Sequence, residues 1–246
     1  MLKDHQDAFG HEFFDYFNTQ GGNREIREII ERDDSYIEVS GGTDVYFQEY
    51  KDWPLHQRKA MRYARGRVLD IGCGAGRHSL YLQEKGLEVM GIDNSPLAVK
   101  VCKQRGLANT EVMSINQIGR QLGIFDTVIM MGNNFGLFGS FERARRLLEK
   151  LNTVTSKNGR IIAETIEVYQ TDNPDHLSYH EFNRQRGRMG GQVRIRARYK
   201  KYTTPWFDYL MVSKKEMEEI LEGTGWRVMK YIESNSPRYI AILEKK

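Results

Sequence analysis

The stretch VLDIGCGAGRHSLYL, Val68 to Leu82, places an apolar run, an acid and three glycines immediately before a helix-like segment. Glycine loses more conformational freedom on folding than any other residue, so this density beside a buried strand needs a local reason. A strand that ends in a glycine turn and enters a helix lets a ligand approach the backbone. Three occupants of the turn remain open: a dinucleotide, another nucleoside-bearing cofactor, or only a neighbouring protein segment.

The spacing of the glycines argues against a dinucleotide. The dinucleotide motif G-x-G-x-x-G, started at Gly72, would need its third glycine at position 77, which is Arg77 here. The third glycine is instead Gly76, one residue early. Asp93 ends the next strand, 21 residues after Gly72, where a carboxylate can accept the hydroxyl groups of a ribose. Asp70, just before the turn, suits a ligand with a cationic part, such as an ammonium or a sulfonium.

Short apolar runs alternate with amphipathic segments from Arg67 onward. This rhythm predicts an α/β fold with a mainly parallel sheet and helices on both of its faces. The expected strands are 68–71, 88–92, 110–113, 124–131 and 160–166, and the expected helices are 76–85, 95–105, 141–153 and 213–222. Two consecutive strands, 226–234 and 238–245, predict an antiparallel pair at one sheet edge. Upstream we expect helices at 4–18, 25–32 and 54–64, and we expect an irregular polar stretch at 168–189.

These residues together resemble the class I S-adenosylmethionine-dependent methyltransferases. The resemblance rests on VLDIGCGAGR, on VMGIDNSP around Asp93, on the strand FDTVIMM with its exit GNN, and on the C-terminal strand pair. It implies a three-layer Rossmann-like sandwich with a seven-stranded sheet in the order 3-2-1-4-5-7-6, strand 7 antiparallel. Residues 53–246 would form the methyltransferase domain. Residues 1–52 would be a helical N-terminal extension or lid, and 168–212 a loop and β-hairpin inserted after strand 5, over the cleft.

The resemblance also implies a cofactor, S-adenosyl-L-methionine, and a set of residues that contact it. Asp70 would lie near the methionine end and Asp93 would hold the ribose. The other expected contacts are the backbone of Gly72, Cys73 and Gly74, then Asn94 beside the ribose acid, and Met131 and Gly132 against the methionine amine. Many members of the family carry an acid near the adenine amine, but this chain has Ser114 and Ile115 at that place. Ser114 would form a hydrogen bond with adenine, and Ile115 would pack on its face.

Candidates for contacting the methyl acceptor lie outside the glycine turn. Asn133 and Asn134 follow the fourth strand, where a doubly wound sheet opens its cleft, although such residues also make ordinary loops. Tyr46 and Tyr50 are candidates for a lid, with core packing as the alternative. His180 is a further candidate, in a stretch that is either a loop over the cleft or only a solvent-exposed loop. It lies four residues after His176, but the pattern is not that of a metal site, so no metal is expected.

The segment 193–201 carries basic residues at every second position. Arg194, Arg196, Arg198 and Lys200 share one face of the expected strand. A solvated face of an edge hairpin explains this pattern, and so does recognition of an anionic acceptor, with Arg196 as the candidate contact. Binding of RNA is a further alternative, weakened because Tyr199 falls on the opposite, apolar face.

The bulk composition is that of an ordinary globular domain. The chain has 246 residues, of which 39% are hydrophobic and 28% charged, and a formal net charge of +4, too mild to argue for nucleic acid. Two cysteines favour a reduced, cytoplasmic setting, and no apolar run is long enough to span a membrane.

We therefore expect methyl transfer to a small-molecule acceptor, which an anionic group would suit. An activated sulfonium needs chiefly an in-line nucleophile and exclusion of water, so no catalytic base is assigned. The alternatives are an RNA or protein methyltransferase that uses the basic strand, and a non-catalytic module that only binds the cofactor.

Overall fold

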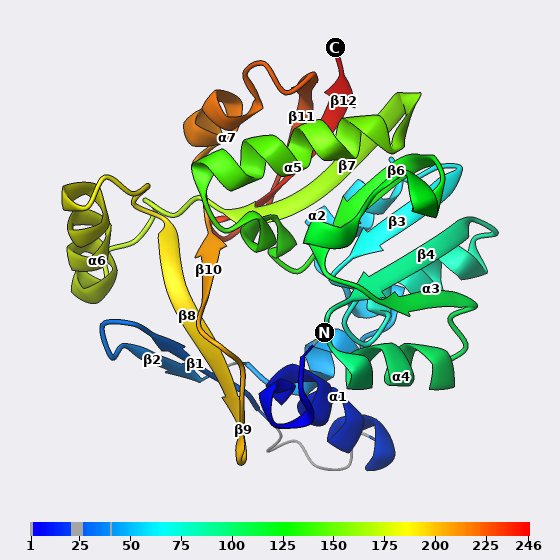
Figure 1. Ribbon diagram of the computed structural model, residues 1–246, viewed down its shortest axis with the longest axis horizontal. Coiled ribbons are helices and arrows are strands. Elements are labelled where there is room, and N and C mark those ends of the chain that lie inside the picture. Colours follow the sequence, from blue (N-terminus) through cyan, green and yellow to red (C-terminus); the bar gives the residue numbers. More distant parts are fainter. Residues whose placement is uncertain (1, 21–26, 40) are drawn as a thin grey trace. The chain divides into compact units, whose positions relative to one another are not determined.

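The central feature of the computed structural model, which describes residues 2–20, 27–39 and 41–246, is a seven-stranded mixed sheet (Figure 1). Its order is β11-β12-β7-β6-β3-β4-β5. The strands are β3 (Arg67–Ile71), β4 (Glu88–Asp93), β5 (Asn109–Val112), β6 (Phe125–Met130), β7 (Thr155–Ile166), β11 (Trp226–Glu233) and β12 (Arg238–Lys245). Because β12 is antiparallel to both β7 and β11, the predicted order 3-2-1-4-5-7-6 and the antiparallel seventh strand are confirmed.

Two compact units make up the chain. The first contains the described residues of 1–53, 67–117 and 195–207, and the second contains 54–66, 118–194 and 208–246.

The first unit surrounds β3, β4 and β5 with α3 (Arg77–Glu84) and α4 (Pro96–Gln104). Ser95 caps α4 by accepting a hydrogen bond from the Ala98 amide, and Pro96 stands at its first position, as the sequence predicts. In place of one helix over 4–18, the chain forms the short 3₁₀ helix η1 (Asp4–Gln6) and then α1 (Ala8–Asn18). Figure 1 shows α1 lying beside α4, and Phe13 of α1 packs on Ala98 and Val101 of α4.

The segment predicted as a helix at 25–32 is a strand where it is described. Its first two residues lie outside the described residues, and β1 (Ile29–Arg32) is antiparallel to both β2 (Ile37–Val39) and β8 (Gln192–Tyr199). The helical prediction was wrong because pairing with other strands, including the sequence-distant β8, supplies the backbone hydrogen bonds here, and local periodicity does not reveal that pairing. The N-terminal extension is therefore only partly helical; it also contains the 3₁₀ helices η2 (Thr43–Tyr46) and η3 (Tyr50–Asp52).

The basic segment pairs with strands that follow it in the chain, as a hairpin requires, but it is an inner strand of its sheet and not the expected edge strand. The second sheet has the order β10-β8-β1-β2, with β10 (Phe207–Leu210) on one side of β8 and the short β9 (Tyr202–Thr203) also paired to it. Ala197 and Tyr199 are buried against Ala8, so the apolar side of β8 faces the core as alternation predicts.

The second unit contains β6, β7, β11 and β12 with α2 (Leu55–Met61), α5 (Phe141–Thr153) and α7 (Lys214–Leu221). The predicted capping box of α7 is present, since Ser213 and Glu216 bond reciprocally. The stretch expected to be irregular contains α6 (Pro174–Gln185), which begins where Asn173 accepts a hydrogen bond from Asp175. Its weak apolar periodicity hid this helix, which buries Tyr179.

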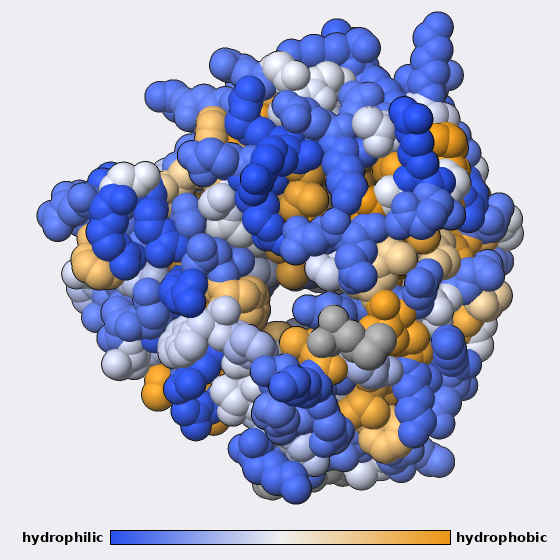
Figure 2. Space-filling model, in the orientation of Figure 1, coloured by the Kyte–Doolittle hydropathy of each residue, from blue (hydrophilic) through white to orange (hydrophobic). Residues whose placement is uncertain are grey.

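The surface carries mostly polar side chains. Figure 2 shows hydrophilic residues over most of one face, interrupted by small apolar patches. Among the described residues, no helix has the length and apolar character needed to cross a membrane.

Candidate functional site

The glycine turn is held open by backbone conformations that only glycine adopts readily. Gly72, Gly74 and Gly76 have φ values of 72°, 55° and 84°, all in the left-handed region. The amides of Gly72 and Cys73 both donate to the Ile92 carbonyl, at 2.9 and 3.1 Å. The turn therefore presents bare backbone at the carboxyl end of β3, where a ligand can approach closely.

Asp93 ties the end of β4 to this turn. Its Oδ2 accepts from the Gly74 amide at 3.0 Å, and its Oδ1 accepts from the Ser95 amide at 2.9 Å. Burial raises the pKa of Asp93 to about 6, although these two hydrogen bonds favour the carboxylate. Asn94 follows it and is exposed. The predicted ribose acid thus lies in hydrogen-bond contact with the second glycine of the turn.

Asp70 is buried below the turn, with 2% of its surface exposed. Ser79 of α3 donates a hydrogen bond to its Oδ2 at 2.6 Å. Burial raises the pKa of Asp70 to about 7, and the nearby charge of Asp93 adds to the shift. When both carboxyls are ionised, their negative charge favours a cation over an anion at this turn.

We expect Asp70→Asn to stabilise the ligand-free protein at pH 8. A carboxyl whose pKa is raised from 3.8 to about 7 contributes stability below pH 4 that is lost as the pH rises through 7, about 4 kcal/mol in all. Asn keeps an acceptor for Ser79 and cannot ionise. Denaturant unfolding at pH 5 and pH 8 should show a smaller drop for the variant than for the wild type. The exposed control Asp172→Asn should behave as the wild type; an equal drop in Asp70→Asn would contradict the assignment.

Ser114 and Ile115 follow β5 at the same edge of the sheet. The Met113 amide donates to the Asp93 carbonyl at 2.8 Å, which brings this segment beside the ribose acid. The Ser114 hydroxyl accepts from the Asn116 amide at 3.3 Å, and Ile115 is 9% exposed. The first unit thus gathers the residues predicted for the ribose and the adenine.

Aromatic side chains of the N-terminal segment cover the turn. The ring of Phe13 packs over Gly74, because a Cβ atom added to Gly74 would lie 3.5 Å from it. The centres of the Phe13 and Tyr46 rings are 4.7 Å apart. Tyr46 also donates to Glu28 at 3.1 Å. Tyr50 instead stacks on Tyr81 of α3 at 4.2 Å. Of the two predicted lid tyrosines, Tyr46 is thus the one that contacts the layer on the glycines.

Arg196 is engaged in ion pairs and stacking. It pairs with Glu31, which also pairs with Arg198, and its guanidinium lies 4.6 Å from the Trp206 ring centre. Glu31 of β1 therefore neutralises part of the positive charge on the basic face of β8.

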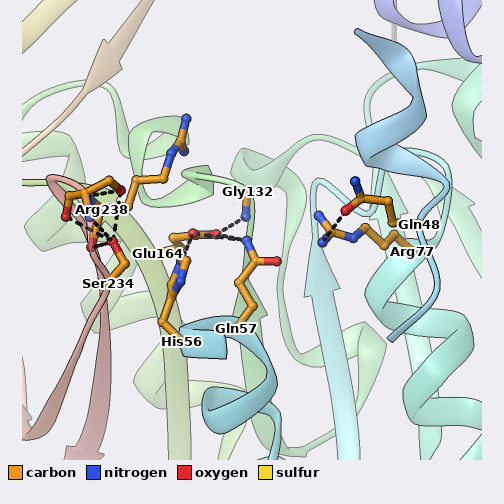
Figure 3. Close-up of polar contacts among 9 residues, drawn as sticks. Gln48, His56, Gln57, Arg77, Gly132, Glu164, Ser234 and Arg238 are labelled. Atoms are coloured by element: carbon orange, nitrogen blue, oxygen red, sulfur yellow. Dashed lines mark hydrogen bonds and ion pairs between the residues drawn. The ribbon is translucent and has the colours of Figure 1, made fainter. Parts of the chain in front are cut away.

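A buried carboxylate organises the second unit (Figure 3). Glu164 of β7 is fully buried and accepts hydrogen bonds from His56 at 2.9 Å and from Gln57 at 2.9 and 3.1 Å. The Gly132 amide donates to it at 2.7 Å. Burial alone raises the pKa of Glu164, but the bonds from His56 and Gln57 outweigh it and lower the pKa to about 2.

Sequence reasoning missed this network. The signal was present, because Glu164 is a single acid inside the apolar strand RIIAETI. The network fixes Gly132 and, next to it, Met131, which is 3% exposed. The bond uses the N–H of Gly132.

The loop after β6 is held from a second side. Asn133 has a φ of 69°, is 9% exposed, and its carbonyl accepts from the Tyr209 hydroxyl at 2.6 Å. Asn134 starts the 3₁₀ helix η6 (Asn134–Phe138). His180 lies on α6 instead, 4% exposed, with its ring 5.3 Å from Tyr169. Asn133 is thus held by Tyr209 of β10, whereas His180 is buried on α6 against Tyr169.

Residues 68–159 match the family model described as a methyltransferase domain. A putative methyltransferase from Bacillus subtilis is 31% identical over 107 residues, 44% of this chain and 36% of that protein. A ubiquinone biosynthesis O-methyltransferase from Xanthomonas oryzae is 38% identical over 93 residues, covering 32% of this chain and 39% of that one. The matched region thus spans about a third of the length of these curated relatives.

Among solved structures, a SAM-dependent methyltransferase from Bacteroides fragilis, in complex with S-adenosyl-L-homocysteine, has a TM-score of 0.83 and 25% identity. The similarity covers 100% of this chain and 97% of that one. A SAM-dependent methyltransferase from Methanosarcina mazei, at 19% identity and a TM-score of 0.56, shares the fold.

Proposed function

Because this chain belongs to the class I S-adenosylmethionine-dependent methyltransferases, we propose that it transfers the methyl group of S-adenosylmethionine to a small-molecule acceptor. The observation that carries the proposal is the pair Asp70 and Asp93 on either side of a left-handed glycine turn, with Asp93 bonded to Gly74. The acceptor class is supported by the names of relatives, which include a ubiquinone biosynthesis O-methyltransferase and a glycine/sarcosine N-methyltransferase from Parasynechococcus marenigrum.

The residues of the turn fit such a cofactor. Asp93 would accept the ribose hydroxyls while the bare backbone of Gly72 to Gly74 admits the nucleoside, and Ser114 and Ile115 would contact adenine. Asp70 would favour a cationic methionine end by opposite charge. The bound cofactor supplies an activated methyl group. The chain's own task is to place the acceptor in line and exclude water, and the ring of Phe13 above Gly74 suits that exclusion.

The N-terminal segment 1–52 is proposed as the lid of this site, on the contacts of Phe13 and Tyr46. Two further roles stay predictions of the resemblance. One is the contact of the cofactor or the acceptor with Met131, Gly132, Asn133 and Asn134, and the other is the insertion of segment 168–212.

A turnover assay tests the proposal. Purified protein with S-adenosylmethionine should form S-adenosylhomocysteine when small phenols, amines and carboxylic acids are supplied in pools, and should form none without acceptor. Turnover with RNA or protein acceptors alone would contradict the small-molecule assignment. Cofactor binding without turnover in any pool would favour the non-catalytic alternative.

The charge pairing of β8 predicts weak, non-specific RNA binding at most. Because Glu31 pairs with two of its arginines, few counterions can be released on contact with phosphates. We expect a fluorescent RNA to bind no better than micromolar at 50 mM salt. Tight binding that falls a hundredfold or more between 50 and 200 mM salt would revive the RNA alternative, and Glu31→Gln is the variant that should strengthen binding.

A further inference from the structure

A pocket lies in the first unit, and neither Asp70 nor Asp93 is among the described residues that line it. Its volume is about 340 Å³, within the usual range for small-molecule sites. It is lined by Tyr16, Phe17, Gln20, Phe47 and Arg105. Tyr16 and Phe17 come from α1, Phe47 follows η2, and Arg105 is the residue after the last turn of α4.

Arg105 gives the pocket a positive charge, and within the described part of the chain no carboxylate is paired with it. Its Nη1 donates to the Ala75 carbonyl at 2.6 Å, and its guanidinium carbon lies 4.8 Å from the Phe47 ring centre. Among the described residues, no carboxylate forms an ion pair with it, and its surroundings bury it far enough to lower its pKa. A partly desolvated cation without a counterion is unfavourable in the free protein and favours binding of an anion.

The remaining walls are aromatic. The rings of Tyr16 and Phe47 lie 4.6 Å apart, and Phe17 completes the wall. A planar guanidinium on a ring face matches a carboxylate, which it can bind through two parallel hydrogen bonds. Aromatic walls match a flat, apolar body, since ring pairs attract beyond the area that they bury.

From these observations we propose that the pocket of Tyr16, Phe17, Gln20, Phe47 and Arg105 binds a small aromatic carboxylate. Arg105 bonds to Ala75, which belongs to the glycine turn. The ring centre of Phe47 lies 6.5 Å from that of Phe13, the aromatic ring that packs over Gly74. The ligand would therefore sit behind the cover of the cofactor turn without touching the residues assigned to the ribose. This site goes beyond the proposed methyl transfer and does not depend on it.

Fluorine NMR with 4-fluorobenzoate tests the proposal on the full chain. Added protein should broaden or shift the fluorobenzoate signal and leave the neutral 4-fluorobenzamide signal unchanged. Arg105→Met should weaken binding at least tenfold. Lys103→Met removes an exposed charge two residues away on the same helix and should bind as the wild type. Phe47→Leu, which retains the cation, should weaken binding less than Arg105→Met.

Competition with S-adenosylhomocysteine separates this site from the cofactor site. Saturating S-adenosylhomocysteine should leave fluorobenzoate bound. Displacement of the probe, equal binding of the benzamide, or binding unaffected by Arg105→Met in protein that still unfolds cooperatively would each overturn the proposal. Failure of S-adenosylhomocysteine to bind in the same samples would count against the proposed function alone.

Discussion

Asp93→Ala should weaken binding of S-adenosylhomocysteine by about a hundredfold or more. In the proposed complex the carboxylate would accept two ribose hydroxyls, and a hydrogen bond to a charged group contributes about 1.5–3 kcal/mol. The same change removes the acceptor for the amides of Gly74 and Ser95, so part of the loss would come from a less ordered turn. Isothermal titration calorimetry at pH 8, above the pKa of about 6, measures the effect with Asp93 ionised.

Two further variants separate contact from turn geometry. Asp93→Asn keeps one acceptor oxygen for the backbone and should lose less affinity than Asp93→Ala. Glu88 lies on the same strand and pairs with Arg67 at the surface, so Glu88→Ala should bind the ligand as the wild type does. Unchanged affinity in Asp93→Ala would remove the ribose assignment.

Glu164→Gln should lower the free energy of unfolding by about 3–5 kcal/mol. The change places an amide among the donors of His56, Gln57 and Gly132 and leaves buried groups unpaired. Urea unfolding at pH 7 measures the loss. Glu149→Gln, on an exposed position of α5, should lose almost nothing.

The pH dependence gives an independent check on Glu164. Its pKa is lowered from 4.5 to about 2, so its contribution is present above pH 4.5 and is lost as the pH falls toward 2, about 3 kcal/mol in all. The wild type should therefore lose stability over this window more steeply than Glu164→Gln. Parallel curves for the two proteins would show that Glu164 is not the ionised, hydrogen-bonded group described above.

The core of the fold was predictable because its signals are local. The strand–turn–helix of Val68 to Leu82 and the caps at Ser95 and Ser213 each depend on neighbouring residues, and all appear where expected. The strand Ile29–Arg32 was not predictable, because it is placed between a local partner, β2, six to ten residues away, and β8, which lies 163 to 169 residues away in the chain. Pairing across such distances leaves no periodic trace in a four-residue segment.

The residues of the candidate site also divide into those with a local sequence signal and those that depend on partners distant in sequence. Asp70 and Asp93 are anchored by a motif and its spacing, whereas Glu164 gains its partners His56 and Gln57 only through folding, across 108 and 107 residues. For Arg196 the sequence left two alternatives, a solvated edge face or a contact with an anionic acceptor; the ion pair with Glu31, an acid on a strand far away in sequence, was not predictable from either.

Calorimetric titration of the purified chain with S-adenosylhomocysteine and, separately, with NAD tests the central claim most directly. S-adenosylhomocysteine should bind at one site per chain with micromolar or tighter affinity, and NAD should show no measurable heat of binding. Binding of NAD with no binding of S-adenosylhomocysteine would contradict the account of the glycine turn.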